Sequence, residues 1–304
     1  MQMVSASDAA WPFQVARQVA EEERLPLPEV TAQARTQAAL TAGLPGAAVR
    51  VEIEALLMGR GVHLGLQWLH DSGLLAIWLP ELEATVDFSQ EAGRRHKDVW
   101  EHTKQVVRQT VPRPLLRWAA LLHDIGKVPT RTFLPDGGVH FHRHSEVGAR
   151  MFREVAQRLG FEGGDKRKIK FLIYNHLRAG QFDGTWTDAA VRRFDKEMGA
   201  DLTDLLDLSR ADITSARPGK RQAALQSISD LSQRIADVRA ADAILPPLPT
   251  GIGNLIMEHF GLEPSRQIGL LKRALEQAVE AGELPERQPA EFYLPFVAKL
   301  LGRE

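Results

Sequence analysis

The fold and the candidate site both depend on one stretch, Leu115-Leu116-Arg117-Trp118-Ala119-Ala120-Leu121-Leu122-His123-Asp124-Ile125-Gly126-Lys127. It reads as an apolar helix that ends in an adjacent histidine and aspartate, followed by glycine and lysine. Burying a carboxylate beside an imidazole costs free energy unless the two groups pair or bind a metal ion. A neighbouring histidine and carboxylate can share one cation if other segments supply further ligands. A metal site at this pair therefore requires ligands from elsewhere in the chain.

The composition restricts the kind of protein and the kind of site. The chain has 304 residues, 44% hydrophobic and 25% charged, which is typical of a globular protein with one large or two modest domains. Its net charge of -1 gives no global attraction to nucleic acid, so any phosphate-binding surface is local. Because there is no cysteine, a metal ion must be held by histidine and carboxylate. Neither a long apolar run nor a basic-then-apolar leader occurs, so we expect no membrane span, no signal peptide and a cytoplasmic location.

Apolar residues at helical spacing predict a nearly all-helical chain, with glycines and prolines between the helices. The predicted helices cover residues 11–24, 28–42, 49–58, 63–72, 90–110, 115–126, 145–159, 166–177, 189–198, 201–213, 220–241, 252–260, 265–281 and 290–301. Residues 133–141 are the exception, because Asp136-Gly137-Gly138 predicts a turn between two short strands. Three prolines between residues 246 and 249 mark a linker.

Several predicted helices each place one metal-competent side chain on the face that packs inward. His176, for example, completes an i, i+3, i+4, i+7 set with Ile169, Leu172 and Ile173. The same reasoning applies to His102, His144 and Asp212, each of which lies at helical spacing from apolar residues. With the central pair, these side chains give six residues of ligand type.

A structural role is the competing interpretation for each of these residues taken alone. A single histidine on an apolar face is more often a core residue bonded to a carbonyl group, and Asp212 alone could be a helix cap or an ion-pair partner. The joint pattern favours a site, because seven of the ten histidines lie between residues 96 and 176. The histidines expected to be structural or on the surface are His63, His70, His140, His142 and His259.

The order of His102, then His123-Asp124, then Asp212 resembles the signature of the HD superfamily of metal-dependent phosphohydrolases. The chain is more similar still to the part of bacterial CCA-adding enzymes (tRNA nucleotidyltransferases) that follows their catalytic head. The resemblance covers roughly residues 12–290 and is sharpest from 96 to 212. The segments that carry it are Gly73-Leu74-Leu75, Leu79-Pro80-Glu81-Leu82, residues 96–103, 120–127, 141–145 and 191–193, Ala211-Asp212, Gly251-Ile252-Gly253-Asn254 and Gly282-Glu283-Leu284.

The resemblance implies an all-α fold and a divalent-metal cofactor of one or two ions. An HD-domain helical bundle is expected over residues 84–240, between an N-terminal helical segment, 1–83, and a C-terminal helical tail, 241–304. His102, His123, Asp124 and Asp212 would hold one ion. Asp124 would bridge to a second ion held also by His144 and His176. Mixed nitrogen and oxygen ligation suits Mn, Fe, Ni, Co or Zn better than Mg alone.

The resemblance also implies substrates that contain nucleotide phosphate groups. The activities associated with this HD body are those of a 2′,3′-cyclic phosphodiesterase, a 2′-nucleotidase or a phosphatase, each using a metal-activated water molecule. Nucleotidyltransferase heads carry a Gly-Ser turn followed by paired aspartates, and neither Gly-Ser nor Asp-x-Asp occurs in this sequence. Nucleotide addition to tRNA is therefore not expected from this chain alone. We see no extra motif for the deoxynucleotide triphosphohydrolase branch.

Further side chains are candidates for substrate contact. Lys127 lies about one helical turn past His123 and could neutralise a phosphate oxygen, acting with Asp124 as a catalytic residue, or could instead interact with the helix dipole. Residues 166–170 form a local basic cluster that is either a solvated helix face or a contact for RNA phosphates. The other predicted substrate-binding residues are His96, Arg143, Arg178, Arg192 and Arg193.

Two readings without catalysis compete with the phosphohydrolase. The chain could be a tRNA- or RNA-binding body with a structural metal, or a partner subunit of a separate nucleotidyltransferase. Six ligand-type residues argue against a structural metal, because a closed structural site needs only four ligands. The sequence does not decide the oligomeric state.

Overall fold

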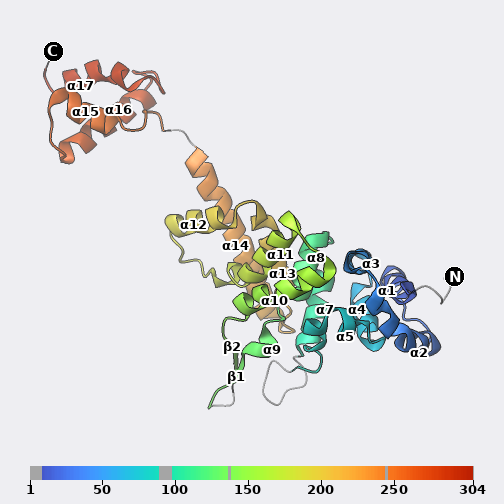
Figure 1. The fold of residues 1–304 in the computed structure, drawn as a ribbon. Coiled ribbons are helices and arrows are strands. Elements are labelled where there is room, and N and C mark those ends of the chain that lie inside the picture. The colour runs from blue at the N-terminus through green and yellow to red at the C-terminus, as the bar shows by residue number, and fades with distance from the viewer. Residues whose placement is uncertain (1–8, 89–97, 136–137, 244–245, 304) are drawn as a thin grey trace. The chain divides into compact units, whose positions relative to one another are not determined.

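The computed structural model describes residues 9–88, 98–135, 138–243 and 246–303, and the elements in these ranges are helices apart from one two-stranded hairpin (Figure 1). The predicted all-α class is therefore confirmed. The chain forms two compact units, Met1–Ala236 and Asp237–Glu304. The predicted division at residues 83 and 240 stays a prediction. None of the described helices has the length and apolarity that a membrane crossing requires.

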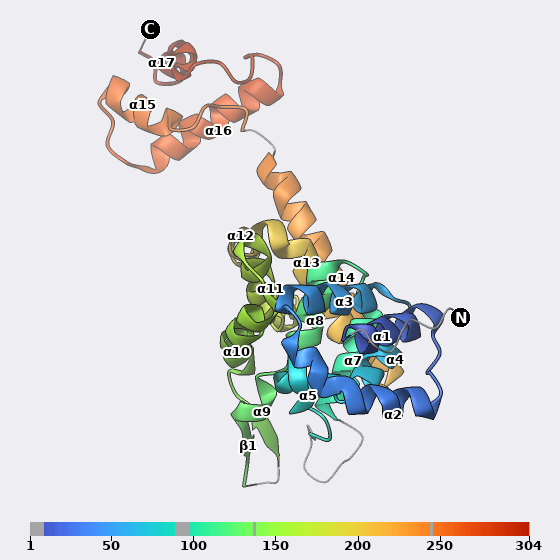
Figure 2. The same ribbon diagram turned by 45° about the vertical axis from the view of Figure 1, so that its right-hand side comes forward.

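The first helices of the larger unit pack mainly on one another, and α1 lies against α3 and α4 (Figure 2). Prolines in the first turn start α1, α2 and α6, where the missing N–H group removes no helical hydrogen bond. Residues 38–43, predicted as the end of one α-helix, form a separate 3₁₀ helix. The elements are α1 (Trp11–Glu22), α2 (Pro28–Gln37), η1 (Ala38–Gly43), α3 (Gly46–Met58), α4 (Val62–Asp71), α5 (Leu74–Trp78) and α6 (Pro80–Glu83).

Helix α8 is the centre of the bundle that follows. Its residues from Leu116 to Leu122 are all buried, and it packs against α7, α11, α3 and α13. Four further helices and two 3₁₀ turns complete this bundle. The elements are α7 (Val99–Gln109), α8 (Pro114–Leu122), α9 (Lys127–Thr130), α10 (His144–Leu159), α11 (Gly163–Asn175), η2 (Ala179–Gln181), α12 (Asp188–Met198), η3 (Gly199–Asp201), α13 (Leu202–Asp212) and α14 (Pro218–Ala243).

Two predicted helix boundaries are wrong for local reasons. Helix α7 begins at Val99 because Asp98 has an extended backbone and its carboxylate accepts hydrogen bonds from the N–H groups of Trp100 and Glu101. Residues 90–97 of that prediction lie outside the described residues. Helix α8 ends at Leu122, and the chain then continues in turns up to α9. The predicted helix 115–126 was therefore too long at its C-terminal end.

The predicted hairpin is confirmed. Strands β1 (Arg131–Phe133) and β2 (Val139–Phe141) are antiparallel, with Thr132 opposite His140. Arg143 follows with a left-handed backbone (φ 60°), and helix α10 starts at the next residue. A non-glycine residue in this conformation costs about 1 kcal/mol. The hairpin thus leads directly into the helix that begins with His144.

Arg117 connects the ends of two other helices to α8. Its buried guanidinium donates to the carbonyl oxygens of Leu57 and Gly59 (3.2 Å) at the end of α3 and of Thr110 (3.1 Å) after α7. Burial lowers the pKa of Arg117. The last carbonyl groups of a helix have no partner within the helix, so this side chain satisfies groups that would otherwise be buried without one.

The smaller unit has its own core. It contains α15 (Ile252–Phe260), α16 (Arg266–Glu280), η4 (Ala290–Tyr293) and α17 (Leu294–Leu300). The fully buried Tyr293 packs in this core, donates a hydrogen bond to the carbonyl of Pro285 (2.9 Å) and accepts one from the N–H of Gln288 (3.1 Å).

We predict that Arg117→Met lowers the free energy of unfolding by about 3 kcal/mol, because buried carbonyl groups lose a charged donor. Denaturant unfolding of the purified chain measures the change. Arg108→Met, at an exposed position of α7, is the control and should change little. Equal effects of the two substitutions would contradict the assigned role of Arg117.

Candidate metal centre

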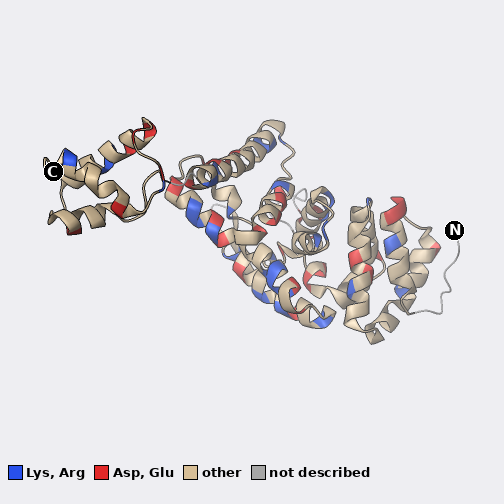
Figure 3. Cartoon of the chain, turned by 90° about the horizontal axis from the view of Figure 1, so that it is seen from above, with Lys and Arg blue, Asp and Glu red and all other residues tan. Residues whose placement is uncertain are grey.

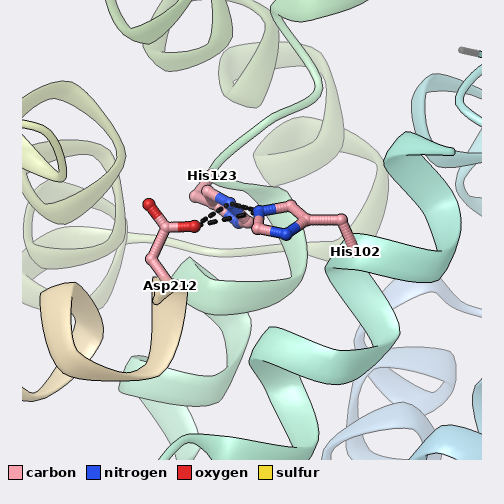
Figure 4. A group of neighbouring side chains, drawn as sticks. All are labelled: His102, His123 and Asp212. Atoms are coloured by element: carbon pink, nitrogen blue, oxygen red, sulfur yellow. Dashed lines mark hydrogen bonds and ion pairs between the residues drawn. The ribbon is translucent and has the colours of Figure 1, made fainter. Parts of the chain in front are cut away.

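The structure brings all six predicted metal ligands together as two groups of three. The first triad is His102, His123 and Asp212, from α7, the end of α8 and α13 (Figure 4). Its imidazole Nε2 atoms lie 3.3 Å apart, and Oδ1 of Asp212 lies 2.9 Å from Nε2 of His102 and 3.5 Å from Nε2 of His123. The three side chains point toward one common place from separate elements (Figure 4).

The second triad is Asp124, His144 and His176. The Nε2 atoms of the two histidines lie 3.3 Å apart. Oδ1 of Asp124 lies 3.4 Å from Nε2 of His144 and 3.9 Å from Nε2 of His176. All three residues are buried, so this triad is the less accessible of the two.

Asp124 faces both triads. While its Oδ1 atom is directed at the second triad, its Oδ2 atom lies 3.2 Å from Nε2 of His123 and 3.4 Å from Nε2 of His102. One carboxylate therefore presents one oxygen to each group. This is the arrangement that a carboxylate bridging two ions requires, and the bridging role itself stays a prediction.

Backbone carbonyl groups fix the orientation of three of the four imidazoles. The Nδ1 atoms of His123, His144 and His176 lie 2.7, 2.9 and 2.7 Å from the carbonyl oxygens of residues 120, 141 and 173. A carbonyl oxygen only accepts, so each Nδ1 carries the proton and leaves Nε2 available toward the centre. Nδ1 of His102 lies 2.9 Å from the hydroxyl oxygen of Thr214.

These residues fit a divalent metal ion. Oδ1 of Asp124 is buried and has no hydrogen-bond partner among the described residues. Within each triad two Nε2 atoms face each other, and their lone pairs repel unless a proton or a metal ion lies between them. A set of imidazole nitrogens and carboxylate oxygens is what Mn, Fe, Co, Ni or Zn accepts.

The charges of the centre follow from burial and from the neighbouring ligands. Burial lowers the pKa of His123, but the carboxylates of Asp124 and Asp212 outweigh it and raise that pKa to about 10. At neutral pH a proton therefore lies on Nε2 of His123 as well as on Nδ1, and a metal ion bound at the first triad would replace the proton on Nε2. Burial and the nearby His123 lower the pKa of His176 to about 4. Burial raises the pKa of Asp124 and of Asp212, but the adjacent histidines outweigh it, so both pKa values lie well below the usual range. Both carboxylates therefore stay ionised and available to a cation.

Gly126 allows the turn after α8 to contact the first turn of α10. A Cβ atom at this position would lie 2.0 Å from the carbonyl oxygen of His144 and 2.6 Å from the backbone nitrogen of Gly148. Only glycine fits this approach, which brings His144 beside Asp124. The glycine that follows the His-Asp pair is thus required by the second triad.

Lys127 has a contact that the sequence analysis did not consider. Its ammonium nitrogen lies 2.6 Å from Oδ2 of Asp124 and 5.6 Å from the centre of the Phe141 ring. The side chain is therefore held at the metal centre by the carboxylate that faces both triads. Its predicted contact with a phosphate group stays a prediction.

The other predicted substrate residues are less closely tied to the centre. His96 lies outside the described residues. Arg143 is exposed, with Nε 3.5 Å from Oε1 of Glu146, and Arg178 forms an ion pair with Glu197 (2.6 Å). Arg192 and Arg193 are exposed on α12. Their roles stay predictions.

A pocket beside the triads was missed by the sequence analysis. It has a volume of about 440 Å³, and its lining includes His176 and Asp212, one residue from each triad. Its other walls come from the turn after α11 and from α14. Hydrophobic spacing in α14 indicates which face packs inward, but it does not indicate against which helix, so no sequence signal located this pocket.

Comparison with known proteins agrees with this geometry. Residues 85–217 match the family model of the HD domain. The chain is 35% identical over 253 residues to the A-adding tRNA nucleotidyltransferase of Deinococcus radiodurans, covering 81% of this chain and 57% of that protein. It is 31% identical over 252 residues to the CC-adding tRNA nucleotidyltransferase of Thermus thermophilus, covering 81% of this chain and 55% of that protein.

Residues 85–217 therefore resemble the HD domain family, and the chain is similar to part of these tRNA nucleotidyltransferases. HD domains bind divalent metal ions, and the two triads could hold them. The chain spans about half the length of the curated relatives it matches, 57% and 55%.

We predict that Gly126→Ala weakens metal binding at the second triad and lowers the free energy of unfolding by about 2 kcal/mol, because the added methyl group forces α10 away. Metal content after dialysis against Mn²⁺ and denaturant unfolding measure the two effects. Gly43→Ala is the control, since nothing lies within 4 Å of an added Cβ atom there. Unchanged metal content in Gly126→Ala would contradict the close-approach argument.

We predict that Lys127→Met tightens divalent-metal binding by about tenfold, because an ammonium group no longer competes for the carboxylate of Asp124. Titration calorimetry with Mn²⁺ measures the affinity. Lys166→Met, on α11, is the control. Weaker binding in Lys127→Met would mean that the lysine supports the ligand geometry and does not compete with the ion.

Proposed function

We propose that this chain is a metal-dependent phosphohydrolase acting on nucleotide or RNA phosphate esters, of the 2′,3′-cyclic phosphodiesterase, nucleotidase or phosphatase type. The observation that carries the proposal is the position of Asp124, which presents one carboxylate oxygen to each of two histidine-containing triads. Two adjacent sites for divalent ions are typical of enzymes that cleave phosphate esters.

The residues of the chain have distinct roles in this proposal. The first triad and the second triad would each hold an ion, with Asp124 shared between them. Divalent ions held there would acidify a water molecule and polarise a phosphoryl oxygen. The side chain of Asp212 is 26% exposed and that of Asp124 only 2%, so a substrate would approach from the side of the first triad. Lys127 adds a positive charge beside that approach.

The names of the relatives support a nucleotide-containing substrate. The bifunctional uridylyltransferase/uridylyl-removing enzyme of Ruegeria pomeroyi is 28% identical over 150 residues, 42% of this chain and 15% of that protein. Removal of a uridylyl group breaks a bond to a nucleotide phosphate. The two long matches are named for nucleotide addition to tRNA. Those activities belong to the relatives, and for this chain they make tRNA a candidate partner.

The competing proposal is a tRNA- or RNA-binding body, or a partner subunit of a separate nucleotidyltransferase. The tRNA-related names of the relatives favour it. The charge distribution gives it less support, because the described helices carry lysine and arginine interspersed with aspartate and glutamate (Figure 3). Part of the basic cluster is also neutralised, since Lys168 forms ion pairs with Asp201 and Asp204.

We predict that the purified chain, supplied with Mn²⁺, Co²⁺ or Ni²⁺, hydrolyses bis(p-nitrophenyl) phosphate or a member of a nucleoside 2′,3′-cyclic phosphate and 2′-monophosphate panel. His123→Ala should lower the rate about a hundredfold or more, because the first triad loses a ligand. His259→Ala, at an exposed position of the smaller unit, is the control. A chain that binds metal but cleaves no member of the panel would exclude the phosphohydrolase and favour the binding body.

A further inference from the structure

We propose that the pocket beside the triads, called here the α14 pocket, binds the uncharged nucleoside part of a substrate that carries a single phosphate group. This inference rests on the proposed function and specifies its substrate class. The α14 pocket is defined by the ten residues that line it: His176, Leu177, Gly180, Gln181, Ser209, Asp212, Ile213, Ala224, Ser227 and Ile228.

The position of the α14 pocket places its occupant next to the reacting phosphate. His176 belongs to the second triad and Asp212 to the first, and both are part of the pocket wall. A phosphate group at the metal centre would therefore have its ester substituent within reach of the pocket. The volume of about 440 Å³ lies in the range of roughly 300–1,000 Å³ that small-ligand pockets have.

The chemistry of the lining favours a neutral ring over further phosphate groups. Leu177, Ile213 and Ile228 supply apolar surface, and Gln181 supplies an amide. Among the described residues that line the pocket, none is lysine or arginine. Binding of a di- or triphosphate requires cationic donors for its extra charges, whereas a planar base with amino groups and a ribose with hydroxyl groups does not.

The two hydroxyl groups of the lining strengthen this preference. The hydroxyl of Ser209 donates to the carbonyl oxygen of Leu205 (2.8 Å), and that of Ser227 donates to the carbonyl oxygen of Phe182 (2.8 Å). Each serine has a single proton, so both oxygens present only lone pairs to a ligand. Lone pairs accept hydrogen bonds from the amino and hydroxyl groups of a nucleoside and repel the oxygens of a phosphate.

The wall formed by α14 is anchored to the larger unit on both sides of the pocket residues. Besides the Ser227 bond, Arg221 donates to the side-chain oxygen of Gln109 on α7 (3.2 Å), and Arg234 forms an ion pair with Asp188 at the start of α12. These contacts fix the pocket wall formed by α14. A larger side chain introduced on this wall would fill the pocket, and this tests directly whether a ligand binds there.

The test compares two leucine substitutions at neighbouring positions of α14. Ala224 lines the pocket, whereas Ala223 is exposed, so Ala224→Leu fills the pocket and Ala223→Leu is the matched control. Binding of adenosine, cytidine, guanosine and uridine to the intact chain is measured by titration calorimetry, without turnover. We expect at least one nucleoside to bind, Ala224→Leu to weaken it about tenfold, and Ala223→Leu to leave it unchanged.

A turnover comparison separates this inference from the proposed function. For 2′-monophosphates of the nucleoside that binds, Ala224→Leu should lower kcat/KM about tenfold while leaving hydrolysis of glycerol 2-phosphate unchanged, since that ester has no ring. The corresponding nucleoside triphosphate should be a poorer substrate than the monophosphate. Nucleoside binding without hydrolysis of any ester would support the pocket and overturn the proposed function.

Other outcomes overturn the pocket assignment. Failure of every nucleoside to bind the parent chain would do so, as would an equal loss of activity on glycerol 2-phosphate and on the nucleotide in a folded Ala224→Leu variant. If thermal unfolding shows that Ala224→Leu does not fold, Gln181→Trp fills the pocket from an exposed position of η2 and must give the same selective loss.

Discussion

The buried carboxylate of Asp124 is the group on which the rest of the site depends. It lies between four imidazoles. Its Oδ1 atom faces the second triad, and its Oδ2 atom faces the first triad and pairs with the ammonium group of Lys127. A buried carboxylate is unfavourable unless positive charge and ligand geometry compensate its lost hydration. The histidines and Lys127 on the surrounding elements provide that compensation. Oδ1 has no hydrogen-bond partner among the described residues, so its lone pairs are available to a cation. The candidate metal centre is therefore built outward from this residue.

Local backbone geometry explains why the ligands converge. His123 and His176 each follow the last residue of a helix, and each bonds to the carbonyl group three residues earlier. The left-handed conformation of Arg143 starts α10 at His144, and Gly126 allows that helix start to approach the turn beyond α8. Each of these features is a property of the backbone, so the histidine side chains are oriented before any ligand binds. Such preorganisation is what a metal site needs from its protein.

Much of this could be predicted from the sequence, because hydrophobic spacing determines which face of a helix is buried. The inward positions of His102, His144, His176 and Asp212 follow from that rule. Features that depend on contacts between distant segments could not be predicted. The pocket wall formed by α14 belongs to this kind. The ion pair between Lys127 and Asp124 joins residues only three positions apart, but it depends on the turns between α8 and α9, where a continuous helix up to residue 126 was predicted. The start of α7 was mispredicted since the cap formed by Asp98 competes with an otherwise continuous helical pattern.

The central claim is that the six residues form one centre for two divalent ions, and diffraction from Mn²⁺-loaded crystals at the manganese absorption edge tests it most directly. The account predicts two anomalous peaks, one within about 2.3 Å of Nε2 of His102 and His123, the other within the same distance of Nε2 of His144 and His176, with a carboxylate oxygen of Asp124 next to each. Anomalous peaks only elsewhere on the protein, or none at this centre in protein that binds Mn²⁺ in solution, would contradict it.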